Sequence, residues 1–317
     1  MDDRLVTTIT PNPAIDKTYW IDGFRPNRQN ILTRLRTDPG GKGLNIARIL
    51  QGFGLKVSAS GFFGGVTGKE LLGMLAQDGV KIDPVLINGD TRTNTKIIDP
   101  ESGAETEINE PGPYISEAEQ DRLRQYVREY AAKSEYMVFG GSLPRGCAAH
   151  FYVDLIQTAQ EYDCKTILDA SKAPLQEGIQ AAPYLIKPNQ HELSEVLGRE
   201  IGAASSAAEA GVLLRKTYGI EVVVVSLGEL GAVLAGEDGV FHAVPPKVRP
   251  QNTIGAGDSL VAGLIYGLVS GYRLVDCLRL GVACGTLAVT DQATSISKPL
   301  VKAMTEFSKG IEIKPLA

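Results

Sequence analysis

The sequence predicts an α/β fold, in which a doubly wound, mostly parallel sheet has helices on both faces and a small inserted β-sheet. Three observations predict it. Candidate strands and helices alternate along most of the chain, as in parallel sheets built with right-handed crossovers. The run from Val222 to Val225 is wholly apolar, which is typical of a strand covered by helices on both faces. Two stretches break the alternation with short strands that have no helix between them.

The alternation can be followed along the chain. RLVTTIT predicts the first strand, and GLNIARILQGFG a helix with an apolar stripe. A strand at KVSASGFFGG and a helix at GKELLGMLAQDG follow. Ser116 and Glu119 have the spacing of a capping box, which predicts a helix to about Lys133. The remaining elements are strands at YMVFGG, CKTILDAS, PYLIKPN and EVVVVSLG, a helix at AHFYVDLIQTAQEY, a short helix after CKTILDAS, and a mostly helical region from about Ala256 to Phe307.

The two interruptions predict a small sheet inserted into one domain. IDKTYWIDGF and ILTRLRT precede the first helix, and NTKIIDPESGAETEIN predicts a hairpin with its turn near PESG. We expect a single domain over residues 1–317, with lid strands inserted at about 14–37 and 94–110. Such a flap suits closure over an active site, and two surface hairpins without a role are the alternative. Because exposed strand edges favour pairing, we expect a homodimer through the lid.

Composition narrows the classes of function. The chain has 317 residues, 43% of them hydrophobic, and a net charge of −5 without a long charged run. This size is ample for a buried core, and the charge suggests neither a nucleic-acid nor a membrane-surface partner. The start of the chain lacks the long apolar segment of a signal peptide, and no run reaches about 18 apolar residues. The four cysteines form no CxxC pair, so we interpret them as reduced and mostly buried in a cytoplasmic protein.

The stretch TIGAGDS precedes an apolar helical run. Gly255 and Gly257 allow close backbone approach, and the backbone N–H groups at a helix start favour anions. Asp258 beside them is able to accept a proton from a hydroxyl. The alternative is a glycine turn followed by an aspartate that caps the helix. Local sequence leaves both readings open.

GGKGLN, Gly40 to Asn45, places three glycines and a lysine at another helix start. Lys42 suits an anionic group, and Asn45 is able to donate and accept hydrogen bonds with hydroxyls. The alternative is a flexible turn with a solvated lysine.

KPNQHE places Asn189 and Glu192 on one helix face. An amide and a carboxylate suit a hydrated magnesium ion. A plain capping pair is the alternative, and the local sequence favours it.

SLGELG follows the buried strand, and Ser226, Gly228 and Gly231 suit a nucleotide crevice at the carboxyl end of that strand. The alternative is a turn into the next strand.

Taken in order, these motifs resemble those of the ribokinase-like (PfkB) family of carbohydrate kinases over nearly the whole chain. The segments that carry the resemblance are TPNPAID, GGKGLNIAR, GSLPRG, KPNQHEL, VVSLGELGA and, most specifically, TIGAGDSLVAG. NPAID, and Arg92 in GDTRTN, are similar to the phosphosugar kinases of the family. The resemblance therefore implies a substrate that already carries a phosphate.

The resemblance also implies a role for each motif residue. Asp258 is the catalytic base, and the backbone N–H groups of Gly255, Ala256 and Gly257 form the anion hole. The residues implied to bind the phosphosugar are Asp16, Gly41 and Asn45 at its hydroxyls, and Arg92, Lys42 and, in a looser alignment, Arg28 at its phosphate. The residues implied to bind ATP are Lys187, Asn189, Ser226, Gly228 and Gly231. Glu192 and Asn189 are implied to organise Mg²⁺ through water.

The expected activity is ATP-dependent phosphoryl transfer to a ketose phosphate. The resemblance is greatest to kinases that convert fructose 1-phosphate to fructose 1,6-bisphosphate, with tagatose 6-phosphate and fructose 6-phosphate as alternative acceptors. A non-catalytic sensor of sugar phosphate or nucleotide is the alternative of another class, and Asp258 argues against it. Several relatives carry Asn, Gly and Arg where this chain has Asp291, Ala293 and Ser295, so a K⁺ requirement stays open.

Overall fold

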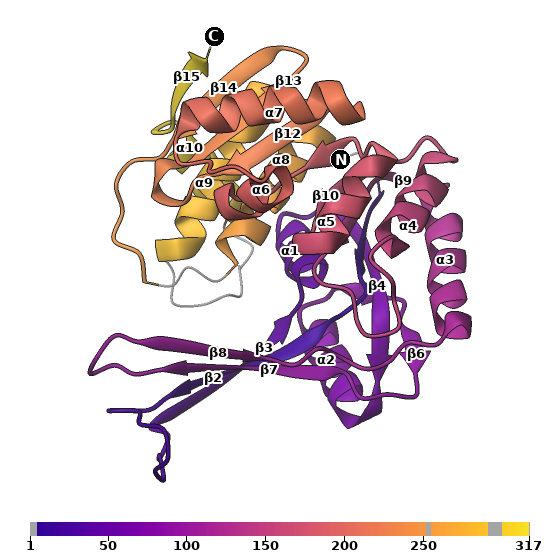
Figure 1. Ribbon diagram of the computed structural model, residues 1–317, viewed down its shortest axis with the longest axis vertical. Helices are drawn as coiled ribbons and strands as arrows, with labels where there is room; N and C mark the ends of the chain where they lie inside the picture. Colours follow the sequence, from indigo (N-terminus) through magenta and orange to yellow (C-terminus); the bar gives the residue numbers. More distant parts are fainter. Residues whose placement is uncertain (1–4, 252–254, 291–299, 317) are drawn as a thin grey trace.

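The computed structural model describes residues 5–251, 255–290 and 300–316. Within these residues, an eleven-stranded sheet forms the body, and a separate four-stranded sheet projects from it (Figure 1). We call the four-stranded sheet the second sheet. Figure 1 also shows helices on both sides of the large sheet, so the predicted architecture is confirmed.

The large sheet is parallel over most of its width. Its strand order is β15-β14-β13-β12-β11-β10-β9-β1-β4-β5, with β6 pairing to β4. The strands are β1 (Leu5–Thr10), β4 (Lys56–Gly64), β5 (Lys81–Ile82), β6 (Val85–Ile87), β9 (Ser134–Gly140), β10 (Lys165–Asp169), β11 (Leu185–Ile186), β12 (Val222–Ser226), β13 (Ala232–Gly236), β14 (Gly239–Val244) and β15 (Glu312–Leu316). The pairs from β12 through β15 are antiparallel, and β13 to β15 lie outside the strands that the sequence predicts.

Two apolar layers cover this sheet because successive strand side chains point to opposite faces. Val222 and Val224 belong to one core cluster, and Val223 and Val225 to the other. The helices on the first face are α1 (Lys42–Gly52), α2 (Gly65–Gln77), α8 (Ala256–Val269), α9 (Leu274–Thr290) and α10 (Leu300–Ser308). The helices on the second face are α3 (Glu117–Ala131), α4 (Phe151–Gln160), α5 (Lys172–Gly178), α6 (Gln190–Leu197) and α7 (Ala204–Tyr218). The wholly apolar β12 is therefore buried from both sides, as predicted.

The start of α3 follows from its sequence. The Glu119 carboxylate accepts hydrogen bonds from the Ser116 backbone N–H and hydroxyl, at 2.8 and 2.7 Å. This capping box satisfies a backbone donor that the first helical turn leaves unpaired. The predicted box is confirmed, and the helix ends at Ala131, two residues before the predicted end.

The second sheet has the order β3-β2-β7-β8. Its strands are β2 (Ala14–Trp20), β3 (Arg34–Gly40), β7 (Arg92–Ile98) and β8 (Glu105–Asn109). They fall within a few residues of the predicted insertions, and β7 and β8 form the predicted hairpin. Asp16 on β2 lies between Asp38 on β3 and Asn94 on β7. The second sheet therefore presents this row of polar side chains on one of its faces.

Two further predictions from composition can be compared with the structure. Cys164, Cys277 and Cys284 are buried and Cys147 is half-buried, and all four are free thiols. Burial raises the pKa of each of these thiols to about 12, so they stay protonated at neutral pH. In the part of the chain that is described, no helix has both the length and the apolar character to cross a bilayer.

Candidate active site

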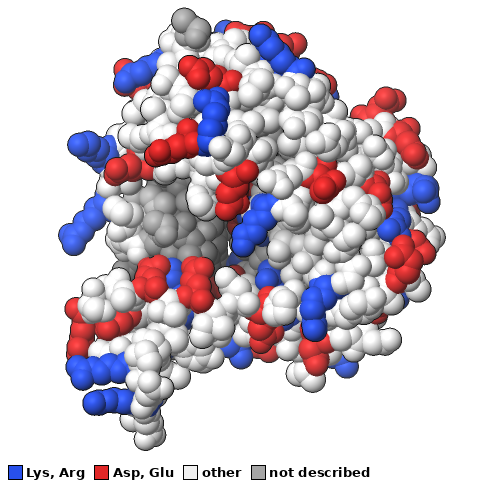
Figure 2. All heavy atoms as spheres, viewed as in Figure 1, with Lys and Arg blue, Asp and Glu red and all other residues white. Residues whose placement is uncertain are grey.

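The site lies where the carboxyl ends of β10, β11 and β12 meet the starts of α1, α6 and α8. In open α/β sheets, ligands bind at this edge. Figure 2 shows side chains of both charge signs on the second sheet and on the body where the two face each other.

Gly255 caps the start of helix α8 in a left-handed conformation, with φ of 77°. The Ser259 N–H bonds to the Gly255 carbonyl at 2.8 Å, so the backbone N–H groups before Ser259 have no acceptor within the helix. They include those of Gly255, Ala256 and Gly257. A Cβ atom at Gly257 would come no closer to any neighbouring atom than 3.6 Å, to Lys187 Nζ. The helix start is therefore an anion-binding geometry with an ammonium group beside it.

Asp258 lies in the first turn of α8 and is only 7% exposed. Its Oδ2 accepts a hydrogen bond from Asn45 Nδ2 at 2.8 Å. Burial and the neighbouring Asp169 raise the pKa of the Asp258 carboxyl to about 6, against the opposing effects of Lys42, Asn45 and Lys187. A carboxylate with a pKa near neutrality suits a general base.

The ammonium groups of Lys42 and Lys187 both contact Asp169, a residue that none of the sequence motifs includes. Asp169 Oδ1 lies 2.8 Å from Lys42 Nζ and 3.5 Å from Lys187 Nζ. Lys42 Nζ also lies 3.8 Å from Glu192 Oε1. Lys42 thus faces the implied magnesium residues, whereas the resemblance implies a contact with the sugar phosphate. The only sequence signal for Asp169 is its place at the end of a predicted strand, where α/β sites gather.

Asn189 and Glu192 form the capping pair that the local sequence favours. Asn189 Oδ1 accepts from the Glu192 N–H at 2.8 Å, and Glu192 Oε2 accepts from the Asn189 N–H at 2.9 Å. This arrangement leaves Glu192 Oε1 on the side of Lys42. Oxygen donors suit magnesium, so a hydrated ion fits this carboxylate. Since the described residues contain no group of three or more His, Cys, Asp or Glu side chains placed for a metal, most ligands of such an ion have to come from water or substrate.

The implied nucleotide residues lie next to this pair. The Ser226 N–H donates to the Pro188 carbonyl at 3.0 Å, and Ser226 forms a parallel bridge with Asn189. The two glycines after Ser226 differ in surroundings. A Cβ at Gly228 would meet no atom within 4 Å, whereas one at Gly231 would lie 2.0 Å from the Ala243 carbonyl oxygen. Gly231 is therefore required by the turn into β13, and Gly228 borders open space.

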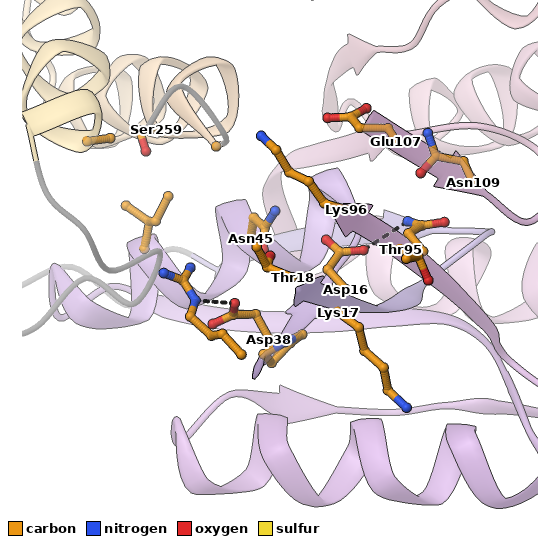
Figure 3. Close-up of a pocket in the computed structure, with 16 residues that line it drawn as sticks. Asp16, Lys17, Thr18, Asp38, Asn45, Thr95, Lys96, Glu107, Asn109 and Ser259 are labelled. Carbon is orange, nitrogen blue, oxygen red and sulfur yellow. Dashed lines mark hydrogen bonds and ion pairs between the residues drawn. The ribbon is translucent and has the colours of Figure 1, made fainter. Parts of the chain in front are cut away.

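A pocket of about 220 Å³ separates the second sheet from the start of α8, and its lining includes Asp16, Asn45, Lys96 and Ser259 (Figure 3). Asn94 Nδ2 donates to Asp16 Oδ1 at 2.9 Å. Burial, as the largest influence, raises the pKa of the Asp16 carboxyl. A Cβ at residue 40 would lie 2.4 Å from that carboxyl group, so only glycine leaves room for Asp16 there. The pocket thus combines polar groups of the second sheet with Asn45 of α1, which donates a hydrogen bond to the Asp258 carboxylate.

The other residues that the resemblance implies for the substrate are Gly41, Arg92 and Arg28, and they lie in different surroundings. Gly41 precedes α1 with φ of 117°, a conformation that glycine adopts readily. Arg92 borders the same region, and its guanidinium donates to the carbonyls of Asn12 and Glu110. Arg28 is exposed in the loop between β2 and β3 and, like Gly41 and Arg92, is absent from the pocket lining. Asp291, Ala293 and Ser295 lie outside the described residues.

Comparisons with known proteins show the family of the chain. The model of the pfkB family carbohydrate kinases matches residues 3–300. The chain is 34% identical over 287 residues to a 1-phosphofructokinase of Vibrio cholerae, covering 90% of each chain. It is 32% identical over 292 residues to a tagatose-6-phosphate kinase of Staphylococcus epidermidis, covering 92% of this chain and 94% of the relative.

Solved structures give the same result. Phosphofructokinase-2 from Escherichia coli, solved in complex with potassium, superposes with a TM-score of 0.89 at 30% identity, covering 96% of this chain and 98% of that one. A possible 1-phosphofructokinase from Thermotoga maritima shares the fold, with a TM-score of 0.87 at 24% identity and coverage of 99% and 100%. Both the family model and the relatives extend over nearly the whole sequence, and the chain therefore belongs to the pfkB family of carbohydrate kinases.

Proposed function

We propose that this kinase transfers the γ-phosphoryl group of ATP to fructose 1-phosphate, giving fructose 1,6-bisphosphate and ADP. The observation that carries the proposal is the placement of Asp258. Its buried carboxylate lies in the first turn of α8 and accepts a hydrogen bond from Asn45, which lines the pocket. A sensor without catalysis has no need of such a base. The 1-phosphofructokinases among the relatives support the choice of acceptor.

The chemistry assigned to this chain is positioning and charge neutralisation. Asp258 accepts the proton of the attacking hydroxyl, and the N–H groups at Gly255, Ala256 and Gly257 bind the oxygens of the transferring group. Lys187 lies beside these N–H groups, and Lys42 lies on the side of Glu192. Both ammonium groups are therefore assigned to the phosphates of ATP.

Mg²⁺ is assigned to the Glu192 side of the site, where the Glu192 carboxylate would hold it through water. The bound ion neutralises charge on the ATP phosphates. Asn189 holds the Glu192 carboxylate in place through the capping box. Ser226 and Gly228 border the nucleotide on the neighbouring strand end.

The phosphosugar is assigned to the pocket under the second sheet, which acts as the lid. Asp16, Gly41 and Asn45 hold its hydroxyls. Arg92 is assigned to the phosphate of the sugar. Three of its five guanidinium N–H groups donate to the carbonyls of Asn12 and Glu110, so two remain to donate to the phosphate. Lys42, which the resemblance places at the sugar phosphate, is assigned to the phosphates of ATP instead.

Tagatose 6-phosphate is the second candidate acceptor, because a named tagatose-6-phosphate kinase is similar over nearly the same length. The assay is ADP formation from ATP with fructose 1-phosphate, tagatose 6-phosphate and fructose 6-phosphate in parallel, each with K⁺ or Na⁺. We expect the highest kcat/KM with fructose 1-phosphate. Absence of ADP formation with all three acceptors, together with retained ligand binding, would favour the sensor.

The role of Asp258 is tested by Asp258→Asn, which keeps the shape of the side chain. We expect kcat to fall by about 10²–10⁴-fold, the usual contribution of a general base, with little change in ATP affinity. Asp276→Asn, on the surface of α9, is the control and should keep its turnover. Near-normal turnover in Asp258→Asn would reject the assignment of the base.

A further inference from the structure

Asp169 is a buried carboxylate that none of the proposed steps uses. It ends β10, and its side chain is 1% exposed. Oδ1 is shared by two ammonium groups, at 2.8 Å from Lys42 and 3.5 Å from Lys187. Oδ2 is buried and has no hydrogen-bond partner among the described residues. An oxygen left unpaired in this way carries a desolvation cost.

The charges around Asp169 keep it ionised. Burial alone raises the pKa of the Asp169 carboxyl, but Lys187 and Lys42 outweigh burial and the net shift is downward. Burial likewise lowers the pKa of Lys42, but Asp169 and Glu192 reverse that shift and the pKa ends above its ordinary value. Asp169 and Lys42 therefore carry full charges at neutral pH, and each has a partner of opposite charge.

The two lysines reach the site from different elements. Lys42 begins α1, one turn before Asn45, which holds Asp258. Lys187 follows β11 and lies beside Gly257 at the start of α8. Neither ammonium group has a second carboxylate within 3.5 Å among the described residues. The single oxygen of Asp169 thus fixes both of them relative to the base.

We propose that Asp169 is a positioning residue for phosphoryl transfer, which holds the ammonium groups of Lys42 and Lys187 beside the anion-binding start of α8. This inference rests on the proposed function. Asp169 acts through the lysines and does not itself touch the reacting atoms. Without it, both side chains are free to leave the path of the phosphoryl group, and a displacement of about 1 Å at such a site costs about 10²-fold in rate.

Asp169 also leaves an electrostatic signature on the base. The groups that face Asp258 are Asn45 and Lys42 from α1, Asp169 from β10 and Lys187 after β11, with Glu192 of α6 beyond Lys42. After burial, Asp169 is the next influence that raises the pKa of Asp258, whereas Lys42 lowers it. Removing the charge of Asp169 should therefore lower that pKa, and removing Lys42 should raise it. Loss of packing alone predicts neither shift.

The experiment is the pH profile of kcat/KM for Asp169→Asn and Lys42→Met, each beside the wild type. We expect Asp169→Asn to lose about 10²-fold in kcat and to shift the acid limb of the profile down by about one pH unit. Lys42→Met should shift the acid limb upward. Glu119→Gln is the control, because Glu119 is also a buried carboxylate with a lowered pKa but caps α3, on the opposite face of the large sheet from α1 and α8. Its acid limb should match that of the wild type.

The outcomes separate this inference from the proposed function. A wild type without kinase activity refutes the proposed function before any variant is compared. An active wild type, with an Asp169→Asn variant that is folded by its melting temperature and has an unmoved acid limb, overturns the positioning role. If Asp169→Asn does not fold, Lys42→Met decides, and an unmoved or lowered acid limb in that variant overturns the inference.

Discussion

At the scale of one residue, the ionised carboxylate that the proposed mechanism needs at Asp258 lowers the stability of the folded state. Its pKa rises from an ordinary value of 3.8 to about 6, chiefly through burial, so the folded state binds the proton more tightly than the unfolded state does. The stability gained from this proton is fully present below about pH 4 and is lost as pH rises through about 6. At neutral pH and above, the ionised carboxylate therefore destabilises the fold.

This sign gives a prediction for Asp258→Asn that is separate from turnover. At pH 8 the variant should be more stable than the wild type by about 3 kcal/mol, the free energy equivalent of the pKa shift. The difference should shrink as pH falls from 6 toward 4. Urea denaturation of both proteins at pH 8 and pH 5 measures it. Equal midpoints at pH 8 would contradict the raised pKa.

Some features of the site cannot be predicted from sequence motifs alone. Asn45 and Asp258 lie in separate motifs, and their hydrogen bond is a tertiary contact that no local spacing contains. At Asn189 and Glu192, the capping pair is present and still leaves one carboxylate oxygen for an ion, so the two readings of KPNQHE are compatible. No motif identifies Asp169 as a site residue, because an aspartate after a strand can have many structural roles.

At the scale of elements, the predictable features are those with local causes. The capping box of α3 and the apolar β12 follow from residues within one element. Strand β5 has only two residues, and pairing with its neighbour defines it more than its own composition does. Strand β15 pairs with β14 across more than sixty residues of sequence, a contact that local periodicity does not encode.

The start of α8 allows stability and activity to be separated. Gly257 is helical and a Cβ there would touch no atom within 3.4 Å, so Gly257→Ala should keep or slightly raise the melting temperature, since alanine favours helix by up to about 1 kcal/mol. The added methyl group points toward Lys187 Nζ, where the phosphoryl group is proposed to bind. We expect kcat to fall by about 10-fold or more, in the range of other losses at anion holes.

Gly73→Ala is the matched control for this variant. Gly73 is an exposed position in α2 where a Cβ would meet nothing within 4 Å, so it should show the same gain in helix stability without loss of turnover. Thermal unfolding and steady-state kinetics on both variants give the comparison. Full activity in Gly257→Ala would place the phosphoryl group away from this turn.

At the scale of the whole molecule, the alternation of strands and helices is sufficient to predict the fold class, and the interruptions are sufficient to predict a second sheet. The pocket is a product of both. Asp16 and Asn94 come from the second sheet, and Ser259 from a helix more than 150 residues later. Their approach depends on how the second sheet leans over the body (Figure 1), which no segment specifies alone.

The second sheet leads to a prediction about assembly. Asp16, Asp38 and Asn94 lie in one cross-strand row. Tyr19 lies opposite Leu35 and Ile97 in another row, and because strand side chains alternate in direction, that row belongs to the other face. Among the apolar side chains of the second sheet, Leu35 is 49% exposed and Ile108 is 56% exposed. Strand β8 is exposed at every position. Apolar side chains on a free sheet are typical of a surface that another chain covers.

We therefore expect the wild type to sediment as a dimer, assembled through the second sheets of two copies. Leu35→Lys combined with Ile108→Lys places two charges in that contact and should weaken association by about 10²-fold or more, so that the variant sediments as a monomer at micromolar concentration. Leu213→Lys is the control, because Leu213 is similarly exposed, at 46%, but lies on α7 in the body. It should remain a dimer. A monomeric wild type, or a double variant that associates as tightly as the control, would show that these sheets do not pair. Loss of the dimer should also raise the KM for the phosphosugar more than the KM for ATP, because the second sheet borders only the sugar side of the site.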